Sequence, residues 1–75
     1  MDQARWGRRI KAFRKLKGYT QIEFAEAVGY SLSMVGEIER GKRQPSDAFI
    51  ERTVETLEVA LVELRPPLDE RKERG

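Results

Sequence analysis

The chain has 75 residues, of which 39% are hydrophobic and 37% charged, and its net charge is +2. This length predicts one small domain that buries roughly 60% of the surface its unfolded form exposes. Cysteine and histidine are both absent, which excludes a disulfide scaffold, a thiolate metal site and the commonest general base. Because no base, nucleophile and oxyanion site are arranged together, we predict no enzyme, no cofactor and no metal site.

The charges are unevenly distributed along the chain. Residues 1–45 carry ten basic and five acidic side chains, a net charge of +5, whereas residues 46–75 carry five basic and eight acidic ones, a net charge of −3. A polyanion facing the first half would explain this division, and ordinary solvated surface is the alternative. No apolar run approaches the ~20 residues that span a bilayer, and no secretory signal pattern is present. We therefore expect a cytoplasmic protein that makes no membrane contact.

A first helix is predicted over residues 4–17. Gly18, which follows it, is the residue type that favours the left-handed conformation at a helix end. Trp6 is expected in the core or in an interface, because it shares the helix's apolar stripe. This stripe has the 3.6-residue period of an amphipathic helix and consists of Trp6, Ile10 and Phe13, widened by Ala12 and Leu16.

Two short helices follow, separated by a glycine. Thr20 and Glu23 have the spacing of a capping box at the start of the second helix, and Gly29 ends it. This helix has about eight residues, too few to be stable alone in water, so packing must hold it. Ser31 is an N-cap residue for the third helix, which Gly41 ends.

Two further helices and a tail complete the predicted order. Ser46 opens a fourth helix that runs to Leu57, and a fifth is expected over residues 59–64, either separate from the fourth or continuous with it. The predicted fold is all-α, a compact bundle of four to five short helices in which the second and third form a helix-turn-helix. We assign the bundle to residues 1–65 and expect the charged residues 66–75 to be a disordered tail or linker.

The span 21–40 meets the geometric requirements of a helix-turn-helix. Ala25 is small where the two helices cross, and Gly29 supplies the positive φ of the turn. Val35 and Ile38 can be buried while the N-terminal face of the third helix stays free.

With its neighbours, this span resembles the lambda-repressor-like, XRE (Cro/CI-type) DNA-binding domains. The shared pattern is T-Q-x-x-(F/L)-A…G-x-S…(I/L)-E-x-G…P, and the resemblance covers about residues 5–64. The residues that carry it are Ile10, Arg14, Gly18, Thr20, Gln21, Phe24, Ala25, Val28, Gly29, Ser31, Val35, Ile38, Glu39, Arg40, Gly41, Pro45, Ser46 and Leu57.

The resemblance implies roles for individual residues. The base-facing side of the third helix corresponds to Leu32, Ser33, Gly36 and Glu37. Contacts to DNA phosphates correspond to Gln21, Ser31, Arg40, Lys42 and Arg43. A structural salt bridge between the first and third helices corresponds to Arg14 and Glu39.

Several of these residues allow a second interpretation. Gln21 could serve as a helix former after the cap, and Lys42 and Arg43 could belong to a solvated loop. Glu37 could accept a hydrogen bond from cytosine N4, although its charge would repel nearby phosphates. Gly36 costs about 1 kcal/mol in a helix interior, which indicates a close approach either to DNA or to another helix.

The resulting prediction is a sequence-specific DNA-binding transcriptional regulator, a repressor being one form, which inserts Leu32–Glu39 into the major groove of double-stranded DNA. The alternative is a protein-interaction module on the same fold, such as an antitoxin, a bridging factor or an oligomerisation domain, with weak DNA binding and a protein partner. A homodimer is also expected, because such domains bind paired half-sites. Its predicted contact is the fifth helix, through Leu61, Val62 and Leu64.

Overall fold

A computed structural model describes residues 3–67 of the chain, and within that range all regular structure is helical. The all-α prediction is therefore confirmed. Of the tail predicted at 66–75, residues 68–75 lie outside the described part. The helices are α1 (Gln3–Leu16), α2 (Gln21–Val28), α3 (Leu32–Glu39), α4 (Asp47–Leu57) and α5 (Leu61–Leu64).

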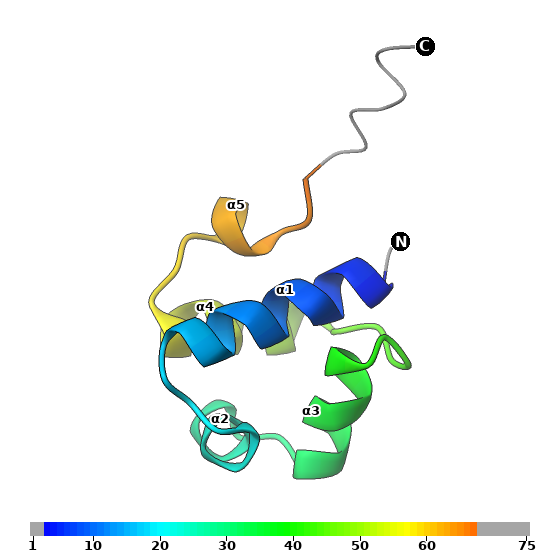
Figure 1. The fold of residues 1–75 in the computed structure, drawn as a ribbon, viewed down its shortest axis with the longest axis vertical. Coiled ribbons are helices and arrows are strands. Elements are labelled where there is room, and N and C mark those ends of the chain that lie inside the picture. The colour runs from blue at the N-terminus through cyan, green and yellow to red at the C-terminus, as the bar shows by residue number, and fades with distance from the viewer. Residues whose placement is uncertain (1–2, 68–75) are drawn as a thin grey trace, which may run out of the picture.

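Helix α1 lies across the middle of the molecule (Figure 1). Helices α2 and α3 lie on one side of it and α5 on the other, while α4 packs against both α1 and α2. The core between these helices is aromatic and aliphatic, with the rings of Phe24 and Phe49 meeting edge to face at 6.2 Å. Its fully buried side chains include Ile10, Phe24, Val28, Val35, Ile38, Phe49, Leu57 and Leu64.

Three helices begin at the caps that the sequence predicts. The Thr20 hydroxyl accepts a hydrogen bond from the Glu23 backbone N–H at 3.0 Å, and the Glu23 carboxylate accepts one from the Thr20 N–H at 2.9 Å. Ser31 and Ser46 cap α3 and α4 in the same way, each at 3.1 Å. Because these bonds satisfy N–H groups that lack partners inside a helix, they fix where each short helix starts.

The close approach in this fold is made by Gly7, in the middle of α1. A Cβ on Gly7 would lie 2.2 Å from the carbonyl oxygen of Ile38 and 2.9 Å from that of Glu39. The backbone of α1 therefore sits directly against the last turn of α3, and a side chain at this position would force the two helices apart. Gly7 carries no cap or turn signal in the sequence, because it lies in the middle of a helix.

The junction between α4 and α5 is sharp. Glu58 adopts the left-handed conformation with φ 56°, and the Val59 N–H donates to the Val54 carbonyl at 3.3 Å. The two helices are thus separate, so the continuous alternative is wrong. Glycine is the residue that usually adopts this conformation at a helix end, and here it is a glutamate. The end of α4 was therefore not clear from the residue type at position 58.

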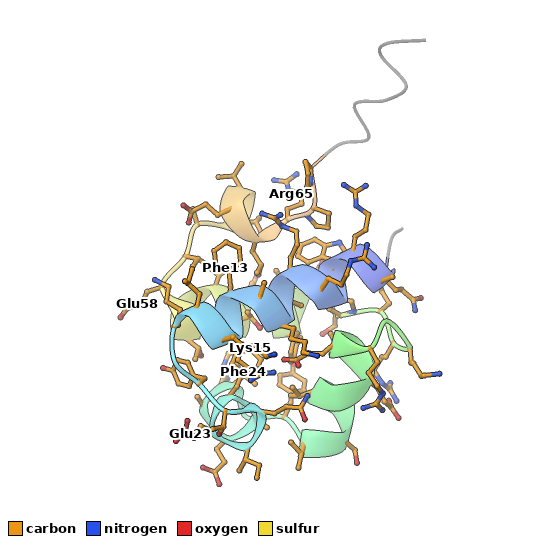
Figure 2. The ribbon with its side chains drawn as sticks, in the orientation of Figure 1. Phe13, Lys15, Glu23, Phe24, Glu58 and Arg65 are labelled. Carbon is orange, nitrogen blue, oxygen red and sulfur yellow. The ribbon has the colours of Figure 1, made fainter. Side chains whose placement is uncertain are left out.

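Helix α5 has four residues and depends on α1 for support. Leu64 is fully buried, and Phe13 lies between α1 and α5 (Figure 2). The Arg9 guanidinium donates to the carbonyl oxygens of Leu64, at 3.1 Å, and Glu63. These are the carbonyls that a helix end leaves without partners, so Arg9 acts as a C-terminal cap supplied by another helix.

Three expectations about apolar side chains were wrong. Ala12 and Leu16 do not widen the buried stripe of α1, because both are exposed, Leu16 to 74%. Leu64 cannot be a dimer contact, since the folded monomer already buries it completely. The fifth helix begins at Leu61 and not at Val59, which is buried in the connecting segment.

In the described part of the chain, no helix is long and apolar enough to cross a membrane.

Alanine substitutions at two helical glycines should have opposite effects on stability. Gly7→Ala should lower the free energy of unfolding by at least about 2 kcal/mol, because backbone atoms of α3 occupy the space of the new methyl group. Gly36→Ala would meet the mobile end of the Arg40 side chain, so it should raise the free energy of unfolding by about 0.5–1 kcal/mol through helix propensity. Urea unfolding followed by far-UV circular dichroism measures both, and equal effects would contradict the assigned helix contact.

Candidate nucleic-acid interface

The outer face of α3 starts at a well-formed helix N-terminus. Leu32 and Ser33, in its first turn, are exposed, and Glu37, one turn later, is partly exposed. Val35 and Ile38 point the other way and are fully buried. The helix therefore presents one free side to solvent while its opposite side is fixed in the core.

Gly36 departs from the predicted base-facing set. It is buried, and the Arg40 side chain covers it: a Cβ on Gly36 would lie 3.0 Å from Arg40 Nη1. The close approach expected at Gly36 is thus to the side chain one turn further along the same helix. Without a side chain of its own, Gly36 lets the Arg40 guanidinium lie along α3.

A buried ion pair fixes the orientation of α3. Arg14 Nε donates to Glu39 Oε2 at 2.7 Å, and Arg14 Nη2 donates to Glu39 Oε1 at 3.0 Å. The side chains are only 7% and 2% exposed. Arg14 Nη1 also donates to the Tyr19 carbonyl at 2.9 Å. The pair predicted for a structural role therefore joins α1 to α3 and to the turn before α2.

Gln21 belongs to the same network. Its side-chain Nε2 donates to Glu39 Oε1 at 3.0 Å, so α2 is tied to the pair as well. The amide is partly occupied and does not point freely into solvent. What α2 can still offer an anion is its N-terminus, where the first-turn N–H groups and the helix dipole favour negative charge.

Other predicted phosphate contacts surround the start and end of α3. The Ser31 hydroxyl accepts from the Met34 N–H, which leaves its own O–H proton free to donate. Arg40, Lys42 and Arg43 are exposed beyond the other end of the helix. Hydroxyl, ammonium and guanidinium donors on both sides of one exposed helix are the groups that bind a phosphate backbone.

The turn that carries these cations is held by the start of α1. Gln3 Nε2 donates to the Gly41 carbonyl at 3.2 Å, and Ala4 packs against Gly41, where an added Cβ would lie 2.9 Å from the Ala4 Cα. Sequence reasoning missed Gln3 and Ala4, because both look like ordinary residues of a first helical turn. The sequence signal of this turn was the glycine at position 41, which adopts a φ of 77°.

Not all of the basic first half faces the α3 surface. Arg5 Nη2 donates to the Pro67 carbonyl at 3.0 Å, and Arg9 caps α5. Both arginines are therefore used on the α5 side of α1, opposite α3 (Figure 1). Their charge does not identify a polyanion site, and the candidate interface is confined to α3 and its two flanking turns.

Comparison with known proteins gives the same fold and a consistent activity. A family model described as helix-turn-helix matches residues 10–64. The chain is 57% identical over 67 residues to the uncharacterized HTH-type transcriptional regulator YazB of Bacillus subtilis, an alignment that covers 89% of this chain and 97% of that protein.

Two solved structures share the fold at 33% and 40% sequence identity. The restriction-modification controller protein C.AhdI of Aeromonas hydrophila has a TM-score of 0.80 and 33% identity, covering 85% of this chain and 97% of that one. A chain of the SinR protein/SinI protein complex has a TM-score of 0.74 and 40% identity, covering 92% of this chain and 65% of that one.

Removing one partner of the buried Arg14–Glu39 pair should strongly lower the free energy of unfolding. Glu39→Gln should lower the free energy of unfolding by about 3–5 kcal/mol, because it leaves the Arg14 charge buried without its carboxylate. The double variant Arg14→Met/Glu39→Leu should lose much less, since it removes both charges. Glu37 forms an exposed ion pair with Arg43, so Glu37→Gln should change the free energy of unfolding by less than about 1 kcal/mol. Equal losses for Glu39→Gln and Glu37→Gln in urea unfolding would contradict the structural role.

Proposed function

This chain belongs to the lambda-repressor-like (XRE) helix-turn-helix family of DNA-binding transcriptional regulators, and from that membership we propose that it binds specific DNA sequences with α3 in the major groove. The observation that carries the proposal is the position of α3. Its inner side is fixed by Val35, Ile38 and the Arg14–Glu39 pair, while Leu32 and Ser33 at its start are exposed. A helix fixed on one side and free at its N-terminal turn is the form that enters a major groove.

We assign the contacts to base edges to the exposed residues of α3. Leu32 offers an apolar contact to a thymine methyl group, and the Ser33 hydroxyl can donate to or accept from a base edge. Gly36 drops out of this set because Arg40 covers it. The proposed activity is DNA binding and not catalysis. The proposed location is the cytoplasm, where the protein would meet the DNA.

Phosphate contacts are assigned to groups on both sides of α3. The N-terminus of α2 at Gln21 and the O–H of Ser31 would meet the backbone before the helix enters the groove. Arg40 and Lys42 would meet it where the helix leaves. These contacts set the register of α3 on the duplex and make binding depend on salt.

A homodimer through α5 is proposed for the same protein. Val62 is 73% exposed and Leu61 is 45% exposed, although α5 is only four residues long. Leu61 also lines a groove between α1, α4 and α5 whose apolar side chains are Trp6, Ile50 and Val54.

The charged side chains that line this groove limit how two copies can meet. The acidic side chains of Asp47, Glu51 and Glu55 line it together with Arg65. An isologous interface places the same patch of both subunits together, so Arg65 of each copy would have to face the acidic side chains of the other. Arg65 lies beside α5, on the side of α1 away from α3 (Figure 2), so a dimer formed there would leave both reading helices free.

The groove also favours the protein-interaction alternative as a second candidate, because a partner protein of suitable charge could occupy it in place of a second copy. SinR, to which this chain is similar, was solved in complex with the protein SinI. Two results together would support this candidate over the homodimer. The wild-type chain would be a monomer that binds one protein partner stoichiometrically, and Val62→Glu would abolish the binding of that partner.

Two substitutions should separate phosphate binding from base reading. Lys42→Ala should weaken binding to all duplexes equally and reduce the slope of log affinity against log salt by about one, because it removes one phosphate contact. Ser33→Ala should weaken binding to the selected sequence while leaving a random duplex unaffected. Fluorescence anisotropy at several salt concentrations measures both. No binding of the wild-type chain to any sequence in a random-site selection would overturn the proposed function.

The dimer is tested by Val62→Glu, with Leu16→Glu as the matched control. The two side chains have nearly equal exposure, 73% and 74%, but only Val62 lies on α5. Val62→Glu should shift the wild-type dimer to a monomer in sedimentation, because it would bury an unpaired charge in the interface. Leu16→Glu should leave the dimer intact. A monomeric wild-type chain at high concentration would contradict this interface.

A further inference from the structure

An ion pair lies on the outer face of α3 and includes a residue from the turn that follows the helix. Arg43 Nε donates to Glu37 Oε1 at 2.7 Å. Both side chains are partly exposed, at 49% and 39%. An exposed pair of this kind contributes little to stability, so its presence on this face needs another reason.

The turn that carries Arg43 is held in place. The Lys42 N–H donates to the Glu37 carbonyl at 2.8 Å, and the Gly41 N–H donates to the Ile38 carbonyl at 3.0 Å. Gln3 of α1 binds Gly41 from the other side. Because the backbone between Glu37 and Arg43 is anchored at Gly41 and Lys42, the Arg43 side chain starts from a fixed point beside Glu37.

The pairing leaves the outer end of the Arg43 guanidinium available. Of its donors, the Nε–H is the one bound to Glu37, and in the described part of the chain Glu37 is the hydrogen-bond partner of Arg43. Arg14 provides the contrast, because its Nε, Nη1 and Nη2 are all bound to protein groups. The two Nη groups of Arg43 form a planar fork that matches the O6 and N7 acceptors of guanine.

We propose that Arg43 is a specificity-determining residue that donates from its two Nη groups to O6 and N7 of one guanine in the major groove, with Glu37 as the positioning residue that holds it. This inference rests on the proposed function of α3. It changes the role that sequence alone suggests for Arg43, which is a phosphate contact. It also explains how an acidic residue can lie on a DNA-facing helix, since its charge is neutralised by Arg43 before DNA arrives.

Phosphate binding by Arg43 is the competing interpretation. A phosphate contact uses the charge and not the fork, so lysine would replace arginine with little effect. A guanine contact needs two parallel donors in one plane, which lysine cannot supply. The substitution Arg43→Lys therefore separates the two interpretations at constant charge.

The test is a random-site selection with the full chain, followed by affinity measurements on the selected duplex, on the same duplex with one G·C pair changed, and on a random duplex. Arg43→Lys should lose the preference for guanine at one position and weaken binding to the selected duplex about 10- to 100-fold. Its binding to the random duplex and its salt slope should remain those of the wild type, because the charge is kept.

Glu37→Gln provides a readout that a purely structural role would not give. Removing its negative charge should strengthen binding to the random duplex, while the loss of the partner that orients Arg43 should reduce the preference for guanine. Lys42→Ala is the matched control from the same turn, and it should keep the selected motif unchanged. Circular dichroism should show the wild-type fold in each variant, since all three side chains are at least partly exposed.

Two results would overturn the inference, and they are distinguishable. If Arg43→Lys selects the wild-type motif with the wild-type ratio of specific to random binding, Arg43 contacts phosphate. In that case Arg43→Ala would weaken all duplexes equally and lower the salt slope by about one. If the wild-type chain selects no motif at all, the proposed function fails, and this inference fails with it.

Discussion

The arrangement of this bundle depends on one buried ion pair. Arg14 and Glu39 meet through two hydrogen bonds, and Tyr19 and Gln21 complete the network. Desolvating two charges is costly, so such a pair is a weak source of net stability. What it does provide is orientation: α1, α2, α3 and the turn between α1 and α2 all contact the same two side chains, and α3 can pack in only one way that keeps both charges satisfied.

Glycine and arginine complete what the ion pair begins. Gly7 lets α1 touch the backbone of α3, and Gly36 lets Arg40 lie flat along the outer side of the same helix. The inner side of α3 is therefore fixed by contact with backbone, and its outer side is shaped by long basic side chains. The free surface that remains is narrow, and it consists of the first helical turn and the Glu37–Arg43 pair.

Features that depend on residues close in sequence could be predicted, whereas features that depend on contacts between helices could not. The caps at Thr20, Ser31 and Ser46 were predicted because an N-cap depends on residues within one turn of it. The exposure of Leu16 and the burial of Leu64 depend on which helices meet, and no periodicity encodes that. Charge was the least informative signal, because Arg5 and Arg9 bind carbonyls beside α5 and Arg43 binds Glu37.

Helix α1 separates the two surfaces that this protein is proposed to use. It contacts α3 through Gly7 and Arg14, and it contacts α5 through Arg9. For an interface built on α5, the spacing between the two reading helices therefore depends on how α1 holds α3 and α5 on its two sides, although α1 itself reads no base. Altering how α1 packs would change which half-site spacing the dimer accepts, without changing any residue that reads a base.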